Sequence, residues 1–231
     1  MPEKELRALL DAQPDILWGF ADISYSPYAE RYTSALVFAV PYGEQLTPET
    51  YTEERFENGI QSARVRLEVV VAEIEALLRS RGVRYWVPPV AQENETELLA
   101  PFSFKFAAVN AGLGWIGKND VVITRRYGPR VRLSAILIDA PFAYGQPKTR
   151  SECPENCTLC VDICPCKALK NRLWTIDSKR AEIIDYRRCN RMRSAYIPRL
   201  GRKSACGLCL AACPFGQTSI EQKRDDRNAD P

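Results

Sequence analysis

Cysteine is the residue type in this chain whose number and spacing point most directly to chemistry. All nine cysteines lie between residues 153 and 213, in two groups that each end in Cys-Pro. The groups read Cys153-x3-Cys157-x2-Cys160-x3-Cys164-Pro165 and Cys189-x16-Cys206-x2-Cys209-x3-Cys213-Pro214. This order is close to the run that holds paired iron–sulfur clusters, where the cysteine before proline ligates the other cluster. The pattern therefore predicts two 4Fe–4S clusters and electron transfer.

The spacing also predicts how eight thiolates divide between the two clusters. Cys157 and Cys160 can hold one cubane from within a single turn, and a short helix after Cys160 would carry Cys164 toward the other. By the same logic Cys213 reaches back to the first cluster. The predicted first set is Cys153, Cys157, Cys160 and Cys213, and the predicted second set is Cys189, Cys206, Cys209 and Cys164. Cys166 is left over, as a buried small residue or a substitute ligand, and we favour the first.

Two other uses of the cysteines were weighed against the clusters. Eight thiolates could hold two zinc ions, although zinc knuckles do not require the x3-Cys-Pro endings. A disulfide framework is disfavoured because the N-terminus, Met-Pro-Glu-Lys-Glu-Leu, has no apolar signal region. We therefore expect a cytoplasmic protein with reduced thiols.

The composition is that of a globular chain able to bury a core. It has 231 residues, of which 45% are hydrophobic and 26% charged. The longest apolar stretch, residues 35–40, is far too short to cross a bilayer, so no membrane role is expected. The net charge of +3 counts the thiols as neutral; with two clusters bound it falls to about −1. Histidine is absent, so any proton donor must be another side chain or water.

The cysteine distribution predicts two domains. Residues 1–148 would form an α/β cofactor or substrate domain, and residues 149–231 a ferredoxin-like module with the two clusters. Gly145, Gln146 and Pro147 would form the linker between them. The predicted fold class is α+β, with helices on a mixed sheet.

Hydrophobic periodicity supplies the elements of the first domain. We expect helices over 3–12 and 97–110, strands over 34–40 and 83–87, and a hairpin of 121–124 with 131–138 that turns near Gly128. The longest helix would start at Thr47-Pro48-Glu49, carry apolar residues from Phe56 to Leu77 at helical spacing, and stop at Gly82.

A glycine-rich string, Gly112-Leu113-Gly114-Trp115-Ile116-Gly117-Lys118, matches G-x-G-x-x-G. A dinucleotide site requires a strand before the string and a helix after it, and here the expected order is the reverse. The string is then a tight connection, or a loop whose amides and Lys118 hold polar groups of a cofactor or substrate.

The string and its continuation, Ala111 to Asn119, resemble the signature of epoxyqueuosine reductases, which are relatives of the reductive dehalogenases. The similarity extends to the early strand ending in Pro41-Tyr42, to Ile136-Leu137-Ile138-Asp139-Ala140-Pro141, and to the cysteine groups. The resemblance implies two 4Fe–4S clusters beside a base-off cobalamin, in a domain related to flavin nitroreductases. It also implies a reduction whose substrate, in that family, is a modified base of tRNA. The cofactor-binding residues carried over are Tyr42, Gly112, Gly114, Lys118 and Asp139.

The chain departs from that family in three places. Leu98, next to Glu97, stands where the family has its Asp proton donor, so no catalytic residue is assigned. Asn58-Gly59-Ile60 replaces an Asp-Tyr-His segment, and the sequence stops soon after Cys213, where larger members continue into a helical-repeat domain that helps to hold tRNA. The sequence therefore gives little support for tRNA as a partner.

Two functions fit these observations. The first is an iron–sulfur reductase whose clusters pass electrons to a cofactor, with cobalamin as the first candidate, or to a small-molecule substrate. The second is a non-catalytic carrier that delivers electrons to a corrinoid or flavin partner protein. Either would take electrons from a donor such as a ferredoxin or flavodoxin. Arginines near the cysteines could neutralise the clusters on a solvated face, dock an acidic donor or contact RNA phosphates: Arg125, Arg126, Arg130, Arg132, Arg187, Arg188, Arg191, Arg193, Arg199 and Arg202.

Overall fold

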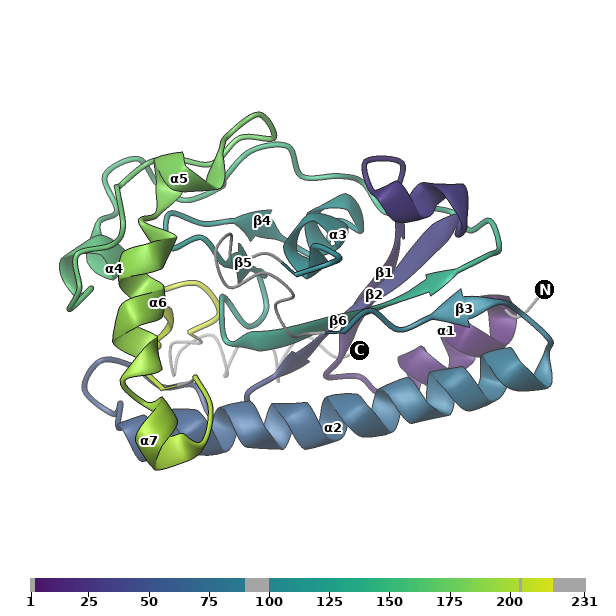
Figure 1. Ribbon diagram of the computed structural model, residues 1–231, viewed down its shortest axis with the longest axis horizontal. Helices are drawn as coiled ribbons and strands as arrows, with labels where there is room; N and C mark the ends of the chain where they lie inside the picture. The colour runs from purple at the N-terminus through teal and green to yellow at the C-terminus, as the bar shows by residue number, and fades with distance from the viewer. Residues whose placement is uncertain (1–2, 90–99, 204, 218–231) are drawn as a thin grey trace, which may run out of the picture.

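A four-stranded sheet forms the centre of the molecule (Figure 1). The computed structural model describes residues 3–89, 100–203 and 205–217. The sheet contains β1 (Leu17–Asp22), β2 (Ser34–Pro41), β6 (Val131–Ile138) and β3 (Tyr85–Trp86), in that order. All three pairings are antiparallel, so the expected mixed sheet is corrected for the described strands. The predicted strand over 34–40 is confirmed, and the one over 83–87 is shorter than expected.

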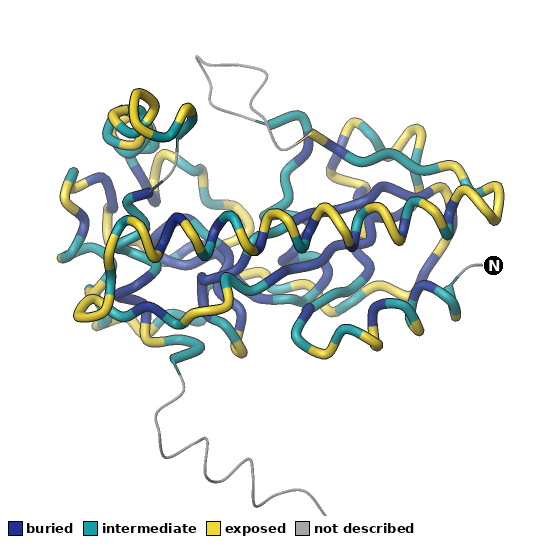
Figure 2. The backbone as a smooth tube through the Cα atoms, turned by 90° about the horizontal axis from the view of Figure 1, so that it is seen from below, coloured by how far each residue is buried: buried dark blue, intermediate teal, exposed yellow. Residues whose placement is uncertain are grey.

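The two central strands are buried on both faces, as Figure 2 shows by their dark colour. Phe38 of β2 lies opposite Ser134 of β6, and Val40 lies opposite Arg132. Strands covered on both faces read as continuous apolar runs, which is the pattern of 34–40 and 133–138. The cysteine-bearing segments meet the sheet where β2 ends and β6 begins.

One face of the sheet is covered by two helices, α1 (Glu3–Asp11) and α2 (Glu53–Ser80), which lie along the lower side of Figure 1. The periodic apolar residues of α2 face the core, as predicted. The expected start at Thr47 is wrong. Thr47 and Thr50 close a separate turn, and the side chain of Thr52 accepts the Arg55 N–H at 3.1 Å as the N-cap.

The other face is covered by α3 (Phe104–Asn110), where small residues let the helix approach the sheet closely. Part of its predicted start, residues 97–99, lies outside the described residues, as do Glu97 and Leu98. Residues 100–103 are not helical, because Pro101 disfavours the helical conformation before it and Ser103 supplies the N-cap. A 3₁₀ turn, η1 (Pro27–Glu30), follows β1.

The predicted hairpin between 121–124 and 131–138 is wrong. The segment β5 (Val122–Ile123) pairs with β4 (Trp115–Ile116), a strand within the glycine string, and β6 pairs with β2 and β3 instead. A turn closed by Thr124 and Gly128 separates β5 from β6. The apolar side chains of β6 are removed from water more completely when the strand lies centrally, between two strands and two helical layers, than at the edge of a short hairpin.

The cysteine-bearing part consists of short helices and loops. They are α4 (Leu159–Asp162), α5 (Arg180–Ile183), α6 (Tyr186–Ser194), α7 (Ile197–Leu200) and α8 (Leu208–Ala211). In Figure 1 this part lies at the end of the sheet opposite α1. The expected short helix between Cys160 and Cys164 corresponds to α4. Among the described helices, none combines the length and the apolar composition that crossing a membrane requires.

Candidate metal centre

The first predicted set of cysteines lines one cavity. Cys153, Cys157, Cys160 and Cys213 line it together with Lys118, Asn119, Ile123, Leu159, Pro214 and Phe215. All four thiols are free. Cys213 belongs to the second sequence group, yet it lies with three cysteines of the first. Cys213 therefore lies where the predicted exchange requires a ligand, and the exchange itself stays a prediction.

The second predicted set lies beneath α6. Cys164, which follows α4, packs in a buried cluster with Cys189 of α6 and Cys209 of α8, and Cys160 and Cys166 border the same cluster. Cys164 does not line the cavity of the first set, although it comes only four residues after Cys160. Cys206 precedes α8, and its carbonyl accepts the hydroxyl of Tyr51 at 2.8 Å. The short helices α4 and α8, which contain Cys160 and Cys209, are thus followed by Cys-Pro cysteines that lie in different groups of residues.

Electrostatic effects between the thiols follow the same division. Burial raises the pKa of Cys160 to about 12, and the charges of Cys213, Cys153 and Cys157 add to that rise. Burial also raises the pKa of Cys206, with a contribution from Cys164. The two sets touch at Cys209, whose pKa is raised by burial and by Cys206, Cys160, Cys189 and Cys164.

These raised pKa values predict that the metal-free protein loses stability at alkaline pH. Burial raises the pKa of Cys160 to about 12 and that of Cys213 to about 11, from 9.0 for a free thiol. The folded state therefore holds more protons than the unfolded state above pH 9, so the free energy of unfolding falls as pH rises. Thermal melts of metal-free protein between pH 7 and 10 should show Tm falling at the alkaline end. An unchanged Tm across that range would contradict the burial of these thiols.

The thiols are not gathered around a single metal ion. Within the described ranges, no three side chains of His, Cys, Asp or Glu come together as such a group. A zinc tetrathiolate would bring four sulfurs onto one ion, whereas a cubane distributes its thiolates over different irons. Cys166 lies 3.8 Å from the Cys164 sulfur, half-buried, and stays predicted as a packing residue.

A buried tryptophan beside the first set lacks a hydrogen-bond partner. Trp115 is fully buried and packs with Cys213, Cys153 and Phe215. Its indole Nε1 is the buried side-chain N or O atom that finds no partner among the described residues. Buried indole N–H groups usually have an acceptor. Trp115 does not line the cavity itself, but a cluster held by Cys153 and Cys213, which it contacts, would bring sulfur acceptors to this side chain, so the residues fit such a group.

The glycine string positions the first set rather than forming an open cradle. Gly112 has φ +74°, and a Cβ there would lie 2.8 Å from the Gln146 carbonyl. A Cβ on Gly114 would lie 2.1 Å from the Ile123 carbonyl, so both glycines allow backbones to approach. Lys118 is 2% exposed, and its Nζ donates to the Glu155 and Cys157 carbonyls at 2.7 and 3.0 Å.

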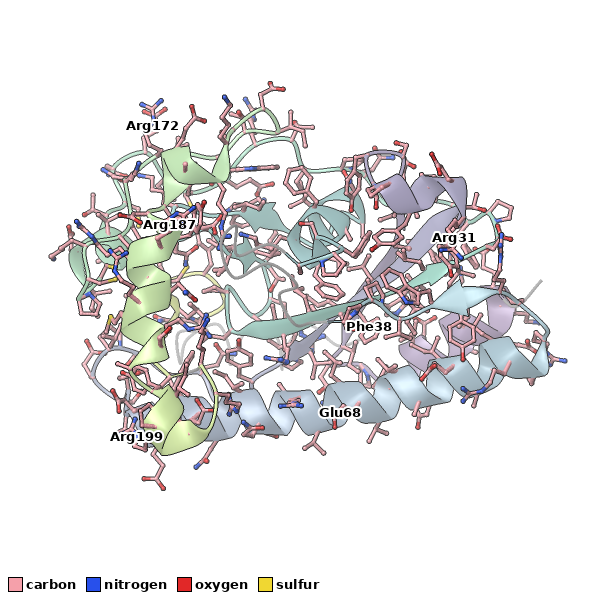
Figure 3. The ribbon with its side chains drawn as sticks, viewed as in Figure 1. Arg31, Phe38, Glu68, Arg172, Arg187 and Arg199 are labelled. Carbon is pink, nitrogen blue, oxygen red and sulfur yellow. The ribbon has the colours of Figure 1, made fainter. Side chains whose placement is uncertain are left out.

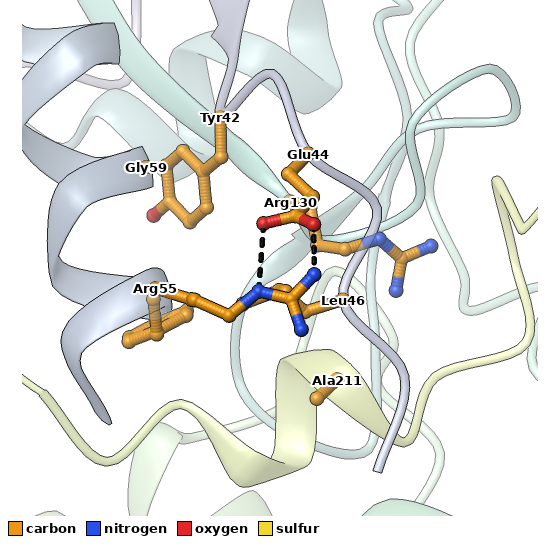
Figure 4. A pocket seen from close by; sticks show the side chains of 8 residues that line it. Tyr42, Glu44, Leu46, Arg55, Gly59, Arg130 and Ala211 are labelled. Carbon is orange, nitrogen blue, oxygen red and sulfur yellow. Dashed lines mark hydrogen bonds and ion pairs between the residues drawn. The ribbon is translucent and has the colours of Figure 1, made fainter. Parts of the chain in front are cut away.

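The remaining carried-over residues lie apart from each other. Tyr42 follows β2 and lines a hollow with Glu44, Arg55, Gly59 and Arg130 (Figure 4). Burial raises the pKa of Tyr42, which also senses Arg132, Arg193 and Cys209. Asp139 follows β6 at the opposite end of that strand, where it pairs with Arg84 at 2.8 Å. The structure therefore places Tyr42 and Lys118 near the cysteines and Asp139 away from them.

Two charged residues near the cysteines are buried, which the sequence reasoning did not predict. Arg130 was grouped with solvated arginines, but it is 2% exposed. Glu57 of α2 is also buried; it accepts the Ala205 N–H at 2.9 Å and pairs with Arg202. Ala205 and Cys206 have φ of 44° and 50°, a left-handed conformation that such residues rarely adopt. The sequence does carry a signal for the burial of Glu57, because this glutamate stands among the apolar positions of the long helix.

Comparison with curated proteins identifies two groups of relatives. The chain is 30% identical over 158 residues to the epoxyqueuosine reductase of Pseudomonas aeruginosa. The matched region covers 67% of this chain and 40% of that protein. It is 31% identical over 163 residues to the tetrachloroethene reductive dehalogenase of Dehalobacter restrictus, covering 64% and 27% respectively. The resemblance predicted from the sequence is confirmed. No family model matches the chain.

Solved structures of the same two groups share the fold. An epoxyqueuosine reductase bound to a modified tRNA-Tyr stem loop superposes with a TM-score of 0.61 at 16% identity, covering 93% of this chain and 65% of that one. A catabolic reductive dehalogenase in complex with 3-bromo-4-hydroxybenzoic acid gives a TM-score of 0.66 at 19% identity, covering 95% and 32%. The chain thus spans less than two thirds of these relatives, and the likeness to reductases extends over most of its own length.

Proposed function

We propose that this chain is an iron–sulfur oxidoreductase that carries two 4Fe–4S clusters. Cys153, Cys157, Cys160 and Cys213 would hold the first cluster, and Cys164, Cys189, Cys206 and Cys209 the second. The observation that carries the proposal is the exchange of Cys164 and Cys213 between the sequence groups, which the cavity of the first set supports. Such an exchange serves two neighbouring clusters, and separate metal sites do not need it.

The bound clusters would supply one-electron transfer. The chain's own residues would ligate them, exclude water and hold the loops in place. Leu159 and Phe215 line the first cavity, Lys118 ties Cys157 to the glycine string, and Asn119 donates to the Cys209 carbonyl at 3.3 Å. These contacts join the cysteine loops to the cysteine-free part of the chain, toward which electrons would pass.

The acceptor is proposed to be a cofactor or small molecule bound near Tyr42, and cobalamin is the first candidate. Relatives named as reductive dehalogenases and epoxyqueuosine reductases support a reduction as the reaction class. The hollow beside Tyr42 has a volume of about 10 Å³, room for one water molecule at most, and is far too small for a corrin. We therefore assign no step to cobalamin.

The small size of that hollow favours a second candidate, an electron carrier that passes its electrons to a corrinoid or flavin partner protein. The proposal that this chain also recognises tRNA is weaker, because the chain spans only 40% of the Pseudomonas aeruginosa reductase. Corrin absorbance that stays with the protein through gel filtration, after anaerobic incubation with cobalamin, would favour the reductase. Loss of the corrin together with retention of iron would favour the carrier.

We further propose that the electron donor is an acidic protein of the ferredoxin or flavodoxin type, and that both act in the cytoplasm. Arg187, Arg188 and Arg191 are exposed on α6, directly over the second set of cysteines. Figure 3 shows Arg187 and Arg199 at this end of the molecule and Arg31 at the other. Opposite charges on two proteins speed their encounter, and salt weakens that effect.

Charge reversal should test the donor surface. We expect Arg187→Glu to slow reduction by a reduced acidic ferredoxin about tenfold at low salt, and much less at high salt. Arg31→Glu, which places the same change on an exposed arginine at the opposite end, is the matched control. Equal rates for the two variants in stopped-flow absorbance measurements would rule out α6 as the docking surface.

The redox function itself is tested on the wild-type protein, prepared without air. Dithionite should bleach the visible absorbance and give an EPR signal of two interacting paramagnets, because the clusters lie side by side. A folded protein with no reducible chromophore would refute the proposed function.

A further inference from the structure

Two buried cations from the cysteine-free part of the chain, before Cys153, reach the first cysteine set. Lys118 and Arg130 are each 2% exposed. Arg130 Nη1 donates to the carbonyls of Leu210 and Cys213 at 2.8 and 3.0 Å, and Nη2 donates to the carbonyl of Phe215. Lys118 contacts the loop of Cys157 from the other side. The two cations therefore hold both loops that bring cysteines to the first cavity.

Neither cation forms an ion pair with a carboxylate in the part of the chain that the structure describes. The partners of Lys118 are two carbonyls and the amide of Asn171, and those of Arg130 are three carbonyls and the amide of Gln45. Burying a charge without an opposite charge is costly. An anion between the two loops would remove that cost, and a cluster bound by four thiolates is such an anion.

The second set lies in a different electrostatic environment. Arg193, which acts on Cys189 and Cys206, is exposed and so is screened by solvent. Arg180, which also acts on Cys189, is only half-buried and is paired with the carboxylate of Asp120 at 3.1 Å. The carboxylate of Glu53 acts on Cys206 with the opposite sign. Because a charge acts more strongly when it is buried, the first set experiences the larger positive potential.

We propose that Lys118 and Arg130 give the cluster bound by Cys153, Cys157, Cys160 and Cys213 the higher reduction potential of the two. This inference rests on the proposed function. Reduction adds one electron, and hence one negative charge, to a cluster; positive charges nearby stabilise that state. A single electron entering the protein would therefore settle on the first cluster.

The first experiment uses the wild-type chain, so it does not depend on any core variant folding. Dithionite is titrated under anaerobic conditions to one electron per chain, and EPR spectra are recorded. The Cys157→Ser variant, whose oxygen ligand alters the signal of the first cluster, assigns the spectrum. We expect the one-electron signal to be the one that changes. A one-electron signal that is unaffected in Cys157→Ser, in protein with full iron content, would overturn the inference and leave the proposed function standing.

The second experiment removes each cation and keeps its size. In Lys118→Met and in Arg130→Met, the reduction potential of the first cluster should fall by about 59 mV. This shift corresponds to about a tenfold change in the one-electron equilibrium constant. The charge-conserving Lys118→Arg and Arg130→Lys should retain most of the potential, and Arg31→Met, on an exposed arginine at the opposite end of the molecule, should not shift it. Potentials that are unchanged in both Met variants at normal iron content would overturn the proposal. Loss of iron from wild-type protein would instead refute the proposed function.

Discussion

The Cys213→Ala variant should lose the cluster of the first sequence group although Cys213 belongs to the second. We expect its iron content, after anaerobic reconstitution, to fall from about eight to about four per chain. The iron that remains should be ligated by Cys164, Cys189, Cys206 and Cys209. The physical reason is that Cys213 faces the cavity of Cys153, Cys157 and Cys160. Cys164→Ala should give the complementary loss, because Cys164 packs with Cys189 and Cys209.

The control for this pair is Cys166→Ala. Cys166 lies 3.8 Å from the Cys164 sulfur and in the same stretch of chain, but neither predicted set includes it. We expect it to keep full iron content, measured together with labile sulfide. Loss of one cluster in Cys166→Ala, or its retention in Cys213→Ala, would show that the assignment of ligands is wrong.

Gly128→Ala should displace the loop that carries Cys213. Gly128 has φ +56°, and a Cβ there would lie 1.9 Å from the Phe215 carbonyl oxygen. From the other side of this contact, a Cβ on Gly216 would lie 2.2 Å from the Gly128 nitrogen. Both clashes are with backbone atoms, so they cannot be relieved by the movement of a flexible side chain. We expect a loss of about 3 kcal/mol or more in the free energy of unfolding and a loss of iron from the first cluster, as urea titration and iron analysis would show.

Two other glycines allow conformational strain to be separated from this contact. Gly82 and Gly201 also have positive φ, of 63° and 68°, but a Cβ on either meets nothing within 4 Å. Gly82→Ala and Gly201→Ala should cost only about 1–2 kcal/mol for the left-handed conformation, with full iron content. If Gly128→Ala behaved like these two, the contact with Phe215 would not position Cys213.

Local patterns predicted the parts of the molecule that local forces determine. The apolar periodicity from Phe56 to Leu77 identified α2, because one face of that helix packs on the sheet. The x3-Cys-Pro endings led to the prediction that Cys164 and Cys213 exchange sets, and Cys213 lines a cavity with the three cysteines of the first group. Neither inference needed to know what the segment would pack against.

The features that the sequence did not reveal depend on residues far apart in the chain. Strand pairing is one: β5 and β6 are neighbours in sequence, yet β6 pairs with β2 because its apolar residues require cover on both faces. Arg130 is another, since its burial follows from carbonyls of Leu210, Cys213 and Phe215, about eighty residues later. Glu57 is a third, since it lies in a distant helix and accepts the N–H of Ala205, a residue with positive φ next to Cys206.

The most direct test of two shared clusters is the metal and sulfide content of wild-type protein kept from air throughout. Two 4Fe–4S clusters predict about eight irons and about eight acid-labile sulfides per chain, with no stoichiometric zinc. A folded, colourless protein that contains zinc but neither iron nor sulfide would contradict the account.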